Sequence, residues 1–185
     1  MNLWQLPTEA VLGGKTYPHA SDFRAILKLM EVLGDESRLP WLRWYLALAL
    51  FYRDPIPRQL EDAAMDYLSR FLTCGQSAAP GAKLLDWQQD AAAIISDVNA
   101  VAGREIRQEP YLHWWTFLSF FHSIREGQLS NLVSIRDKLR RGKKLEPWEQ
   151  EFYRTHKDQV RLRPKETAEE LAHRQALEKL VGGAL

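Results

Sequence analysis

The sequence contains a single cysteine, Cys74, among its 185 residues. It cannot form an intrachain disulfide, which suits a protein of a reducing compartment. Long apolar runs are also missing. The longest extends from Trp44 to Tyr52, far short of the roughly 20 residues that a membrane-spanning helix needs. The N-terminus lacks the basic start and apolar run of a signal peptide. We therefore expect a cytoplasmic protein with no membrane partner.

The chain carries no excess of either charge. Its 25 Lys and Arg and 24 Asp and Glu give a formal net charge of +1, so no global field attracts it to nucleic acid. Hydrophobic residues make up 45% of the sequence, enough for a sizeable core. We predict one helical domain with an N-terminal hairpin over residues 1–160, followed by a linker and an amphipathic helix over residues 161–185.

Motifs for catalysis and metal binding are absent as well. The five histidines form no HExxH motif and no tight cluster with cysteine. No GxSxG occurs, and Gly13-Gly14-Lys15 lacks the spacing of a phosphate-binding loop. Asp86 and Asp90 could share a helix face, but Asp86 is better explained as a helix N-cap. The sequence predicts no catalytic residues, no metal and no cofactor, and we interpret the chain as a non-enzyme.

One β signal stands at the start of the chain. Two short apolar runs within residues 9–17 flank Gly13-Gly14. Because glycine adopts positive φ without steric cost, this pair favours a two-residue hairpin turn. A lone hairpin is marginal in water, so we expect it to pack on helices.

Helical patterns fill the rest of the sequence. Apolar residues recur at helical spacing between signals for starting and stopping a helix. Ser21 and Asp86 are the expected N-caps of the first and fourth helices, and Gly34, Gly103 and Gly142 mark expected ends. The fold class predicted is mainly α, a bundle of about seven helices. Their expected ranges are 21–33, 40–53, 58–73, 86–102, 111–126, 130–141 and one beginning at Pro147.

Two segments are the predicted protein-binding surfaces. A dense run of cations ends the sixth helix, and the terminal helix after Thr167 carries a narrow apolar stripe. The cations could also serve only to stabilise the end of the helix, because positive charges are favoured at a helix C-terminus. It has no interleaved aromatic residue for stacking bases, so an acidic protein partner is favoured over nucleic acid. The predicted binding residues are Arg136, Lys138, Arg140, Arg141, Lys143, Lys144, Leu171, Leu177 and Leu180.

Tryptophan is over-represented, with seven in the chain. Most should lie in the core, and we interpret His113-Trp114-Trp115 in this way. Tryptophan is also enriched at protein interfaces. Trp4, Trp41 and Trp148 lie near element ends and are the expected surface residues.

Several segments together resemble a known family. They are Leu12-Gly-Gly-Lys-Thr-Tyr-Pro18 before Ser-Asp-Phe-Arg, Phe51-Tyr52 before a proline-rich turn, Asp86-Trp-Gln-Gln-Asp-Ala91, His113-Trp-Trp-Thr-Phe117, and the basic stretch leading to Glu149-Gln-Glu-Phe-Tyr153. In their order and spacing, over roughly residues 8–160, they resemble small helical proteins of tailed phages and prophages of mainly Gram-positive hosts. Those proteins are encoded just before the tape-measure gene.

The resemblance implies a tail assembly chaperone. Such a protein would bind the aggregation-prone tape-measure protein, help recruit tail-tube subunits and be absent from the finished virion. It would work in the host cytoplasm without a cofactor. Homo-oligomerisation is left open. The rival hypotheses are a nucleic-acid-binding adaptor, or a phage structural or connector protein, using the basic segment 136–144.

Deletion of residues 164–185 tests the role of the terminal helix. We predict that the deletion weakens self-association or client binding, while the helical circular dichroism signal of the remaining chain is retained. A shortened chain that unfolds would place this helix in the core instead.

Overall fold

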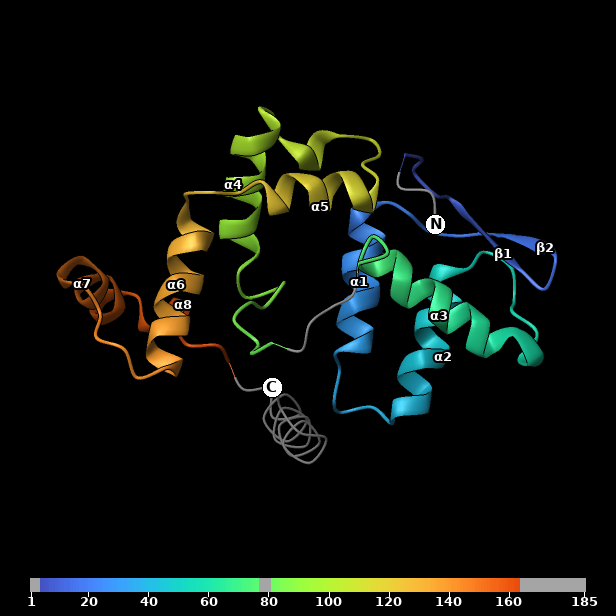
Figure 1. The fold of residues 1–185 in the computed structure, drawn as a ribbon, viewed down its shortest axis with the longest axis horizontal. Helices are drawn as coiled ribbons and strands as arrows, with labels where there is room; N and C mark the ends of the chain where they lie inside the picture. Colours follow the sequence, from blue (N-terminus) through green and yellow to red (C-terminus); the bar gives the residue numbers. More distant parts are fainter. Residues whose placement is uncertain (1–3, 77–80, 164–185) are drawn as a thin grey trace, which may run out of the picture. The chain divides into compact units, whose positions relative to one another are not determined.

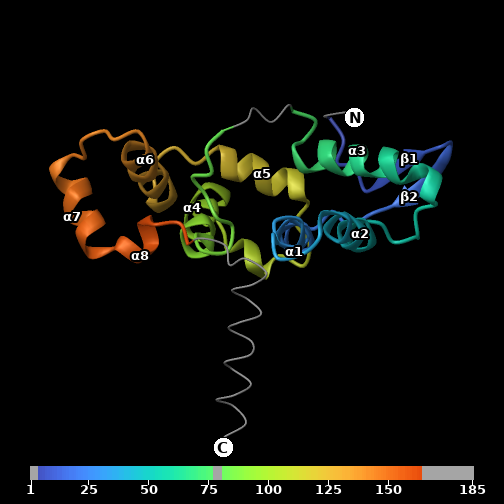
Figure 2. The ribbon, with the colours of Figure 1, turned by 90° about the horizontal axis from the view of Figure 1, so that it is seen from below.

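The computed structural model describes residues 4–76 and 81–163, which divide into two compact units with a boundary after Gln76. Buried apolar side chains occur in both units, whose helices and strands are drawn in Figures 1 and 2. The expected helices 58–73 and 86–102 leave a loop at this boundary, but the sequence analysis treats residues 1–160 as one domain. The terminal helix predicted after Thr167 lies outside the described residues.

The fold is mainly helical with a small N-terminal hairpin, as the sequence predicts. The first unit contains β1 (Glu9–Leu12), β2 (Lys15–Pro18), α1 (Phe23–Leu33), α2 (Pro40–Phe51), the 3-10 helix η1 (Arg58–Leu60) and α3 (Glu61–Leu72). The second contains α4 (Ala91–Ala102), the 3-10 helix η2 (Ile106–Gln108), α5 (Trp114–His122), α6 (Gln128–Arg140), α7 (Pro147–Thr155) and α8 (Lys157–Val160).

The hairpin forms at the predicted turn. Strands β1 and β2 pair antiparallel with Leu12 opposite Lys15, which leaves Gly13 and Gly14 as the two loop residues. Their φ angles are 55° and 80°, the positive values that this turn requires. Alternation along β1 buries Ala10 and Leu12, and α3 contacts this strand. The hairpin is therefore packed on a helix, as expected.

The core of the first unit gathers around a buried histidine. His19 stacks on Phe51 with ring centroids 4.4 Å apart, and its Nε2 lies 3.2 Å from the Tyr67 hydroxyl. That hydroxyl donates to the carbonyl of Glu9. The chain at His19 also forms a β-bridge with Tyr52. These contacts join the hairpin to the end of α2 and the middle of α3, and α2 itself lies beside α1 (Figures 1 and 2).

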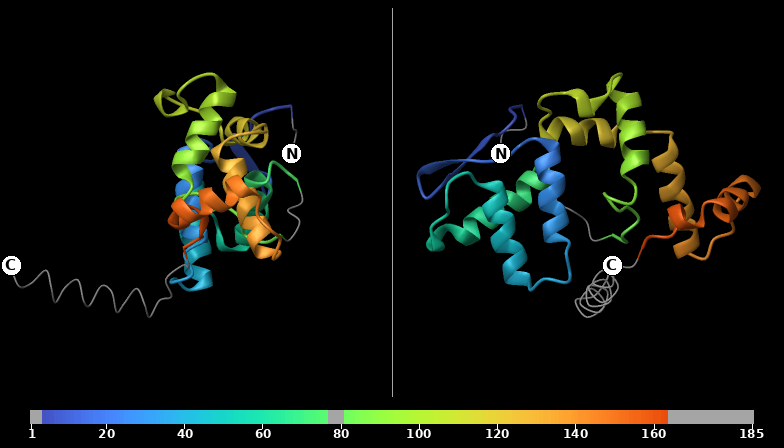
Figure 3. Two further views of the ribbon diagram at one scale, coloured as in Figure 1. Left: turned by 90° about the vertical axis from the view of Figure 1, so that its left-hand side faces the viewer. Right: turned by 180° about the vertical axis from the view of Figure 1, so that it is seen from behind.

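The second unit is built around α4, which contacts both α5 and α6 (Figure 3). The aromatic helix α5 packs on α4 and buries one side of its surface. Trp114 and Trp115 are buried, and the His113 ring accepts a hydrogen bond from the Trp115 backbone at the helix N-terminus. The interpretation of His113-Trp114-Trp115 as core is confirmed.

A glycine is required where α4 meets the start of α6. The buried Asp97 carboxylate accepts hydrogen bonds from the backbone N–H groups of Gln128 and Leu129, at 3.2 and 2.8 Å. It thereby satisfies N–H groups that have no partner within the helix. A Cβ at Gly127 would lie 2.3 Å from an oxygen of this carboxylate. A larger residue at this position would therefore force the Asp97 carboxylate to move, at a cost in stability.

Several predicted helix ends are corrected. The N-cap of α1 is Asp22, whose carboxylate accepts from the Arg24 N–H, and not Ser21. The fourth helix begins at Ala91 and not at Asp86, because residues 86–90 form a separate turn. The fifth is shorter than residues 111–126, and the short α8 was not indicated. The predicted starts at Pro40 and Pro147 and the end at Gly103 are confirmed.

Gly127→Ala should lower the free energy of unfolding of the second unit by about 1–3 kcal/mol, because the new methyl group overlaps the Asp97 carboxylate. Denaturant unfolding followed by circular dichroism measures the change. In an Asp97→Ala background the same substitution should cost much less. An equal penalty in both backgrounds would show that Asp97 is not the cause.

Candidate functional site

The predicted basic surface begins with a residue that the structure buries. The Arg136 side chain on α6 is 5% exposed, and that of its partner Asp90, at the start of α4, is 2% exposed. The two form a bidentate ion pair, with nitrogen–oxygen distances of 2.6 and 2.8 Å. The prediction that Arg136 contributes to an exposed binding surface is therefore corrected.

Arg136 uses all the hydrogen-bond donors that a guanidinium carries. Besides the two bonds to Asp90, its Nε donates to the Val160 carbonyl at 2.7 Å. Nη1 donates to the Leu84 carbonyl at 3.0 Å, and Nη2 donates to the Gln159 carbonyl at 2.6 Å. A buried charge is tolerated only when it is paired and its donors are satisfied. Arg136 meets both conditions and joins α6 to α4, α8 and the segment before α4.

Gln89, just before α4, holds the segment that follows α7 against the second unit. The Gln89 side-chain Nε2 lies within hydrogen-bonding distance of the carbonyls of Asp158, Gln159 and Arg161, at 3.1, 3.2 and 2.7 Å. Its Oε1 accepts from the Arg163 backbone N–H at 2.9 Å. One side-chain amide therefore binds the main chain of residues 158–163 through both its donor and its acceptor.

Lys138 is the second cation with a structural role. Its Nζ lies 2.7 Å from both carboxylate oxygens of Glu149, a side chain that is 1% exposed. Glu149 also accepts from the Glu146 backbone N–H, completing a capping box at the start of α7. The hydrogen bond from Lys138, opposed by burial, lowers the pKa of Glu149 below its ordinary value of 4.5.

The remaining cations of the run lie at the surface. Arg140 and Arg141 both pair with Asp137 at 2.8 Å, and both side chains are about half exposed. Lys143 and Lys144 are exposed, and within residues 4–76 and 81–163 no ion pair is recorded for either. Leu171, Leu177 and Leu180, the predicted apolar contacts, lie outside the described residues. Of the nine predicted binding residues, the structure thus leaves four on an exposed surface.

Exposed aromatic side chains on α2 form a second kind of surface. Trp41, at 65% exposed, and Tyr45, at 63% exposed, lie one turn apart on α2. The helix has only one charged residue, Arg43, in its sequence Pro-Trp-Leu-Arg-Trp-Tyr-Leu-Ala-Leu-Ala-Leu-Phe. A helix that is apolar nearly all round is typical of buried positions. We call Trp41 and Tyr45 the α2 aromatic face.

The other tryptophans expected at the surface are found there. Trp4 is 96% exposed and Trp148 is 52% exposed, so the prediction for Trp4, Trp41 and Trp148 is confirmed. Exposed tryptophan is enriched among the residues that dominate binding energy at protein interfaces. The signal was present in the sequence as an excess of tryptophan near element ends.

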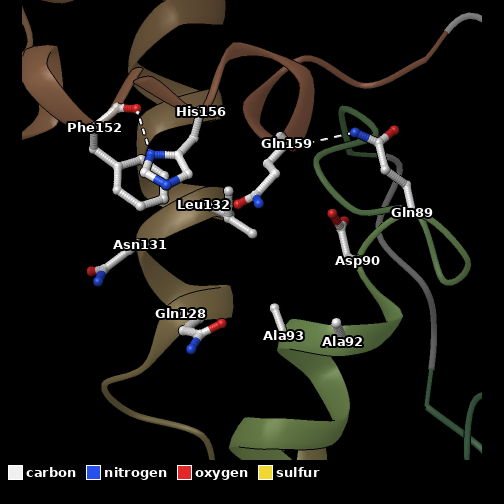
Figure 4. Close-up of a pocket in the computed structure, with 10 residues that line it drawn as sticks. All are labelled: Gln89, Asp90, Ala92, Ala93, Gln128, Asn131, Leu132, Phe152, His156 and Gln159. Atoms are coloured by element: carbon white, nitrogen blue, oxygen red, sulfur yellow. Dashed lines mark hydrogen bonds between the residues drawn. The ribbon is translucent and has the colours of Figure 1, made fainter. Parts of the chain in front are cut away.

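A pocket of about 420 Å³ lies in the second unit, among α4, α6, α7 and α8 (Figure 4). Four of its ten lining residues carry amide side chains, with two alanines on the α4 side and a stacked aromatic pair on another. The lining residues are Gln89, Asp90, Ala92, Ala93, Gln128, Asn131, Leu132, Phe152, His156 and Gln159.

No group of three or more His, Cys, Asp or Glu side chains that could hold a metal ion occurs in the described part of the chain. Burial raises the pKa of the Cys74 thiol to about 11, so this thiol is protonated and weakly nucleophilic at neutral pH. Among these residues no helix is long and apolar enough to cross a membrane.

The fold and these surfaces define a mainly helical protein that exposes aromatic side chains and has a neutral, amide-lined pocket. The family model for the bacteriophage Gp15 protein matches residues 5–162. The match covers most of the chain, which therefore belongs to the bacteriophage Gp15 family and is a phage protein. Neither the curated proteins nor the solved structures contain a significant match.

Arg136→Lys should destabilise the second unit by about 1–3 kcal/mol, since an ammonium keeps the charge but cannot replace the planar fork that pairs with the buried Asp90. Thermal or denaturant unfolding measures the loss. Arg141→Lys, at an exposed pair just after the end of α6, is the matched control and should change stability by less than about 0.5 kcal/mol. Equal, small effects of both substitutions would contradict the structural role of Arg136.

Stability should depend on pH through Glu149. Because its folded pKa lies below the ordinary 4.5, its carboxylate stabilises the fold above that pH, and the contribution is lost as the pH falls through the folded pKa. The difference in unfolding free energy between the wild type and Glu149→Gln should therefore shrink as the pH is lowered from 7 to below 4.5. A difference that is constant over this range would contradict the assignment. Glu31→Gln, at an exposed site of α1, serves as control.

Proposed function

We propose that this chain is a tail assembly chaperone that binds the tape-measure protein of its phage and helps recruit tail-tube subunits. It acts by binding, without a cofactor and without catalysis, in the cytoplasm of the host. Membership of the bacteriophage Gp15 family supports a role in phage structure or assembly. The more specific proposal, that the client is the tape-measure protein, rests on the resemblance to proteins encoded just before the tape-measure gene.

The α2 aromatic face is the observation that carries the binding function. Large aromatic side chains bury much apolar area on association and lose little conformational entropy. Trp41 and Tyr45 form a ridge along one side of a helix whose only charged residue is Arg43. An amphipathic client helix presents the apolar stripe that such a ridge can pack against. We infer that this face contacts the tape-measure protein.

The basic run supports the nucleic-acid adaptor less well than its sequence suggested. Arg136 and Lys138 hold buried or nearly buried carboxylates, and Arg140 and Arg141 share Asp137. These contacts occupy four of the six cations. A weaker cationic patch gives a smaller electrostatic contribution to phosphate binding. The remaining surface cations fit the charged rim around a protein interface.

Replacing Trp41 and Tyr45 together by alanine should weaken binding to the tape-measure protein from the same genome by about tenfold or more. The affinity is measured by titrating the chain against a soluble tape-measure fragment. Val11→Ala, at an exposed site of the hairpin in the same unit, is the control and should bind as the wild type does. Because the replaced side chains are exposed, the melting temperature should hardly change.

Wild-type affinity in the Trp41→Ala, Tyr45→Ala variant would remove the α2 aromatic face from the interface. Failure of the wild-type chain itself to bind any soluble part of the tape-measure protein would contradict the proposed function.

A further inference from the structure

The exposed side of α2 carries three residues at a spacing of four. Trp41 and Tyr45 are 65% and 63% exposed, and Ala49, one turn further along, is exposed as well. Residues four apart are neighbours on the surface of a helix, so the three form a single row, which we call the α2 row. Leu42 and Leu46 are partly buried and flank it. The row and its surroundings on the helix are therefore uncharged.

The one charged residue of α2 is directed away from this row. The Arg43 guanidinium reaches α1, where its Nη1 donates to the Leu33 carbonyl at 3.2 Å. When two copies of a chain pair about a two-fold axis, the same surface patch meets itself. A charge near the axis would then face a like charge, which is costly at an interface. An uncharged row has no such penalty, so the α2 row can contact a second copy of itself.

The order of the side chains along the α2 row makes it complementary to itself. If two copies of α2 pack antiparallel about a two-fold axis at Tyr45, position 41 of each copy lies opposite position 49 of the other. The large side chain of Trp41 then covers the small Ala49 of the second copy at both ends of the contact. Facing positions pack well when large residues meet small ones. The two Tyr45 rings meet at the axis, where an aromatic pair is favourable.

The area of this surface suits a weak dimer. Because an aromatic side chain buries about 150–250 Å² when it is fully covered, the exposed parts of Trp41 and Tyr45 offer roughly 200–300 Å² in each copy. With Ala49 and the flanking leucines, two copies would bury on the order of 800–1,000 Å² in total, below the roughly 1,200 Å² at which stable complexes begin. Dimerisation should therefore be reversible and depend on concentration.

We propose that two copies of this chain associate through the α2 row as an antiparallel, two-fold dimer. The surface is the one that the proposed function assigns to the tape-measure protein. The dimer itself does not rest on the proposed function, and only the competition between the second copy and the client does. Where both hold, the dimer is the form of the chain that is free of client.

Sedimentation equilibrium of the full chain at about 10–500 µM tests the dimer. Trp41→Ala removes the large side chain and Ala49→Trp sets two tryptophans against each other, so each should weaken dimerisation by about tenfold. The Trp41→Ala, Ala49→Trp double variant exchanges large and small and should recover the wild-type affinity to within about threefold. Ala63→Trp, at an exposed site of α3, is the control and should dimerise as the wild type does. Circular dichroism should be unchanged in all four variants, because every replaced side chain is exposed.

The Ala49→Trp variant separates the proposed packing from non-specific association, which an added tryptophan would strengthen. A wild-type chain that stays monomeric overturns the proposal, as does an Ala49→Trp variant that dimerises as tightly as the wild type or a double variant no better than the single ones. Dimerisation that withstands Trp41→Ala but is lost on deletion of residues 164–185 would assign self-association to the terminal segment instead. A monomer that binds the tape-measure protein retains only the proposed function, and a dimer that ignores that protein retains only this inference.

Discussion

The buried pair of Arg136 and Asp90 is the interaction on which the second unit depends. It joins residues that are 46 positions apart in the sequence, and the same guanidinium binds carbonyls of the segments before α4 and after α7. Removing either charge would leave the other buried without a partner, which is costly in a medium of low dielectric constant. The relative positions of α4, α6 and α8, and hence the shape of the amide-lined pocket, follow from this pair.

The α2 aromatic face and the amide-lined pocket belong to different units and differ in chemistry. The α2 aromatic face offers apolar area and suits the stripe of an amphipathic helix. The pocket is lined largely by polar side chains, and Gln128, Asn131 and Gln159 among them are exposed to solvent. The proposed binding function therefore rests on the first surface alone.

Local signals in the sequence were sufficient for much of the fold. The hairpin turn at Gly13-Gly14 and the helix starts at Pro40 and Pro147 depend on the backbone preferences of those residues alone. The role of Arg136 depends on Asp90, Gln159 and Val160, which only the tertiary fold brings near. A run of cations at the end of a helix therefore looked like a surface, and its first member proved to be a buried connector. The contacts of Gln89 and the lining of the pocket likewise depend on residues that are distant in the sequence, so the sequence alone did not predict them.

Co-expression of the chain with the full tape-measure protein of the same genome tests the central claim most directly. Light scattering coupled to size-exclusion chromatography then gives the mass of each soluble species. The account predicts a soluble complex that contains both proteins, and a tape-measure protein that aggregates when expressed alone. A tape-measure protein that is equally soluble without the chain, or a chain that always elutes by itself, would contradict the account.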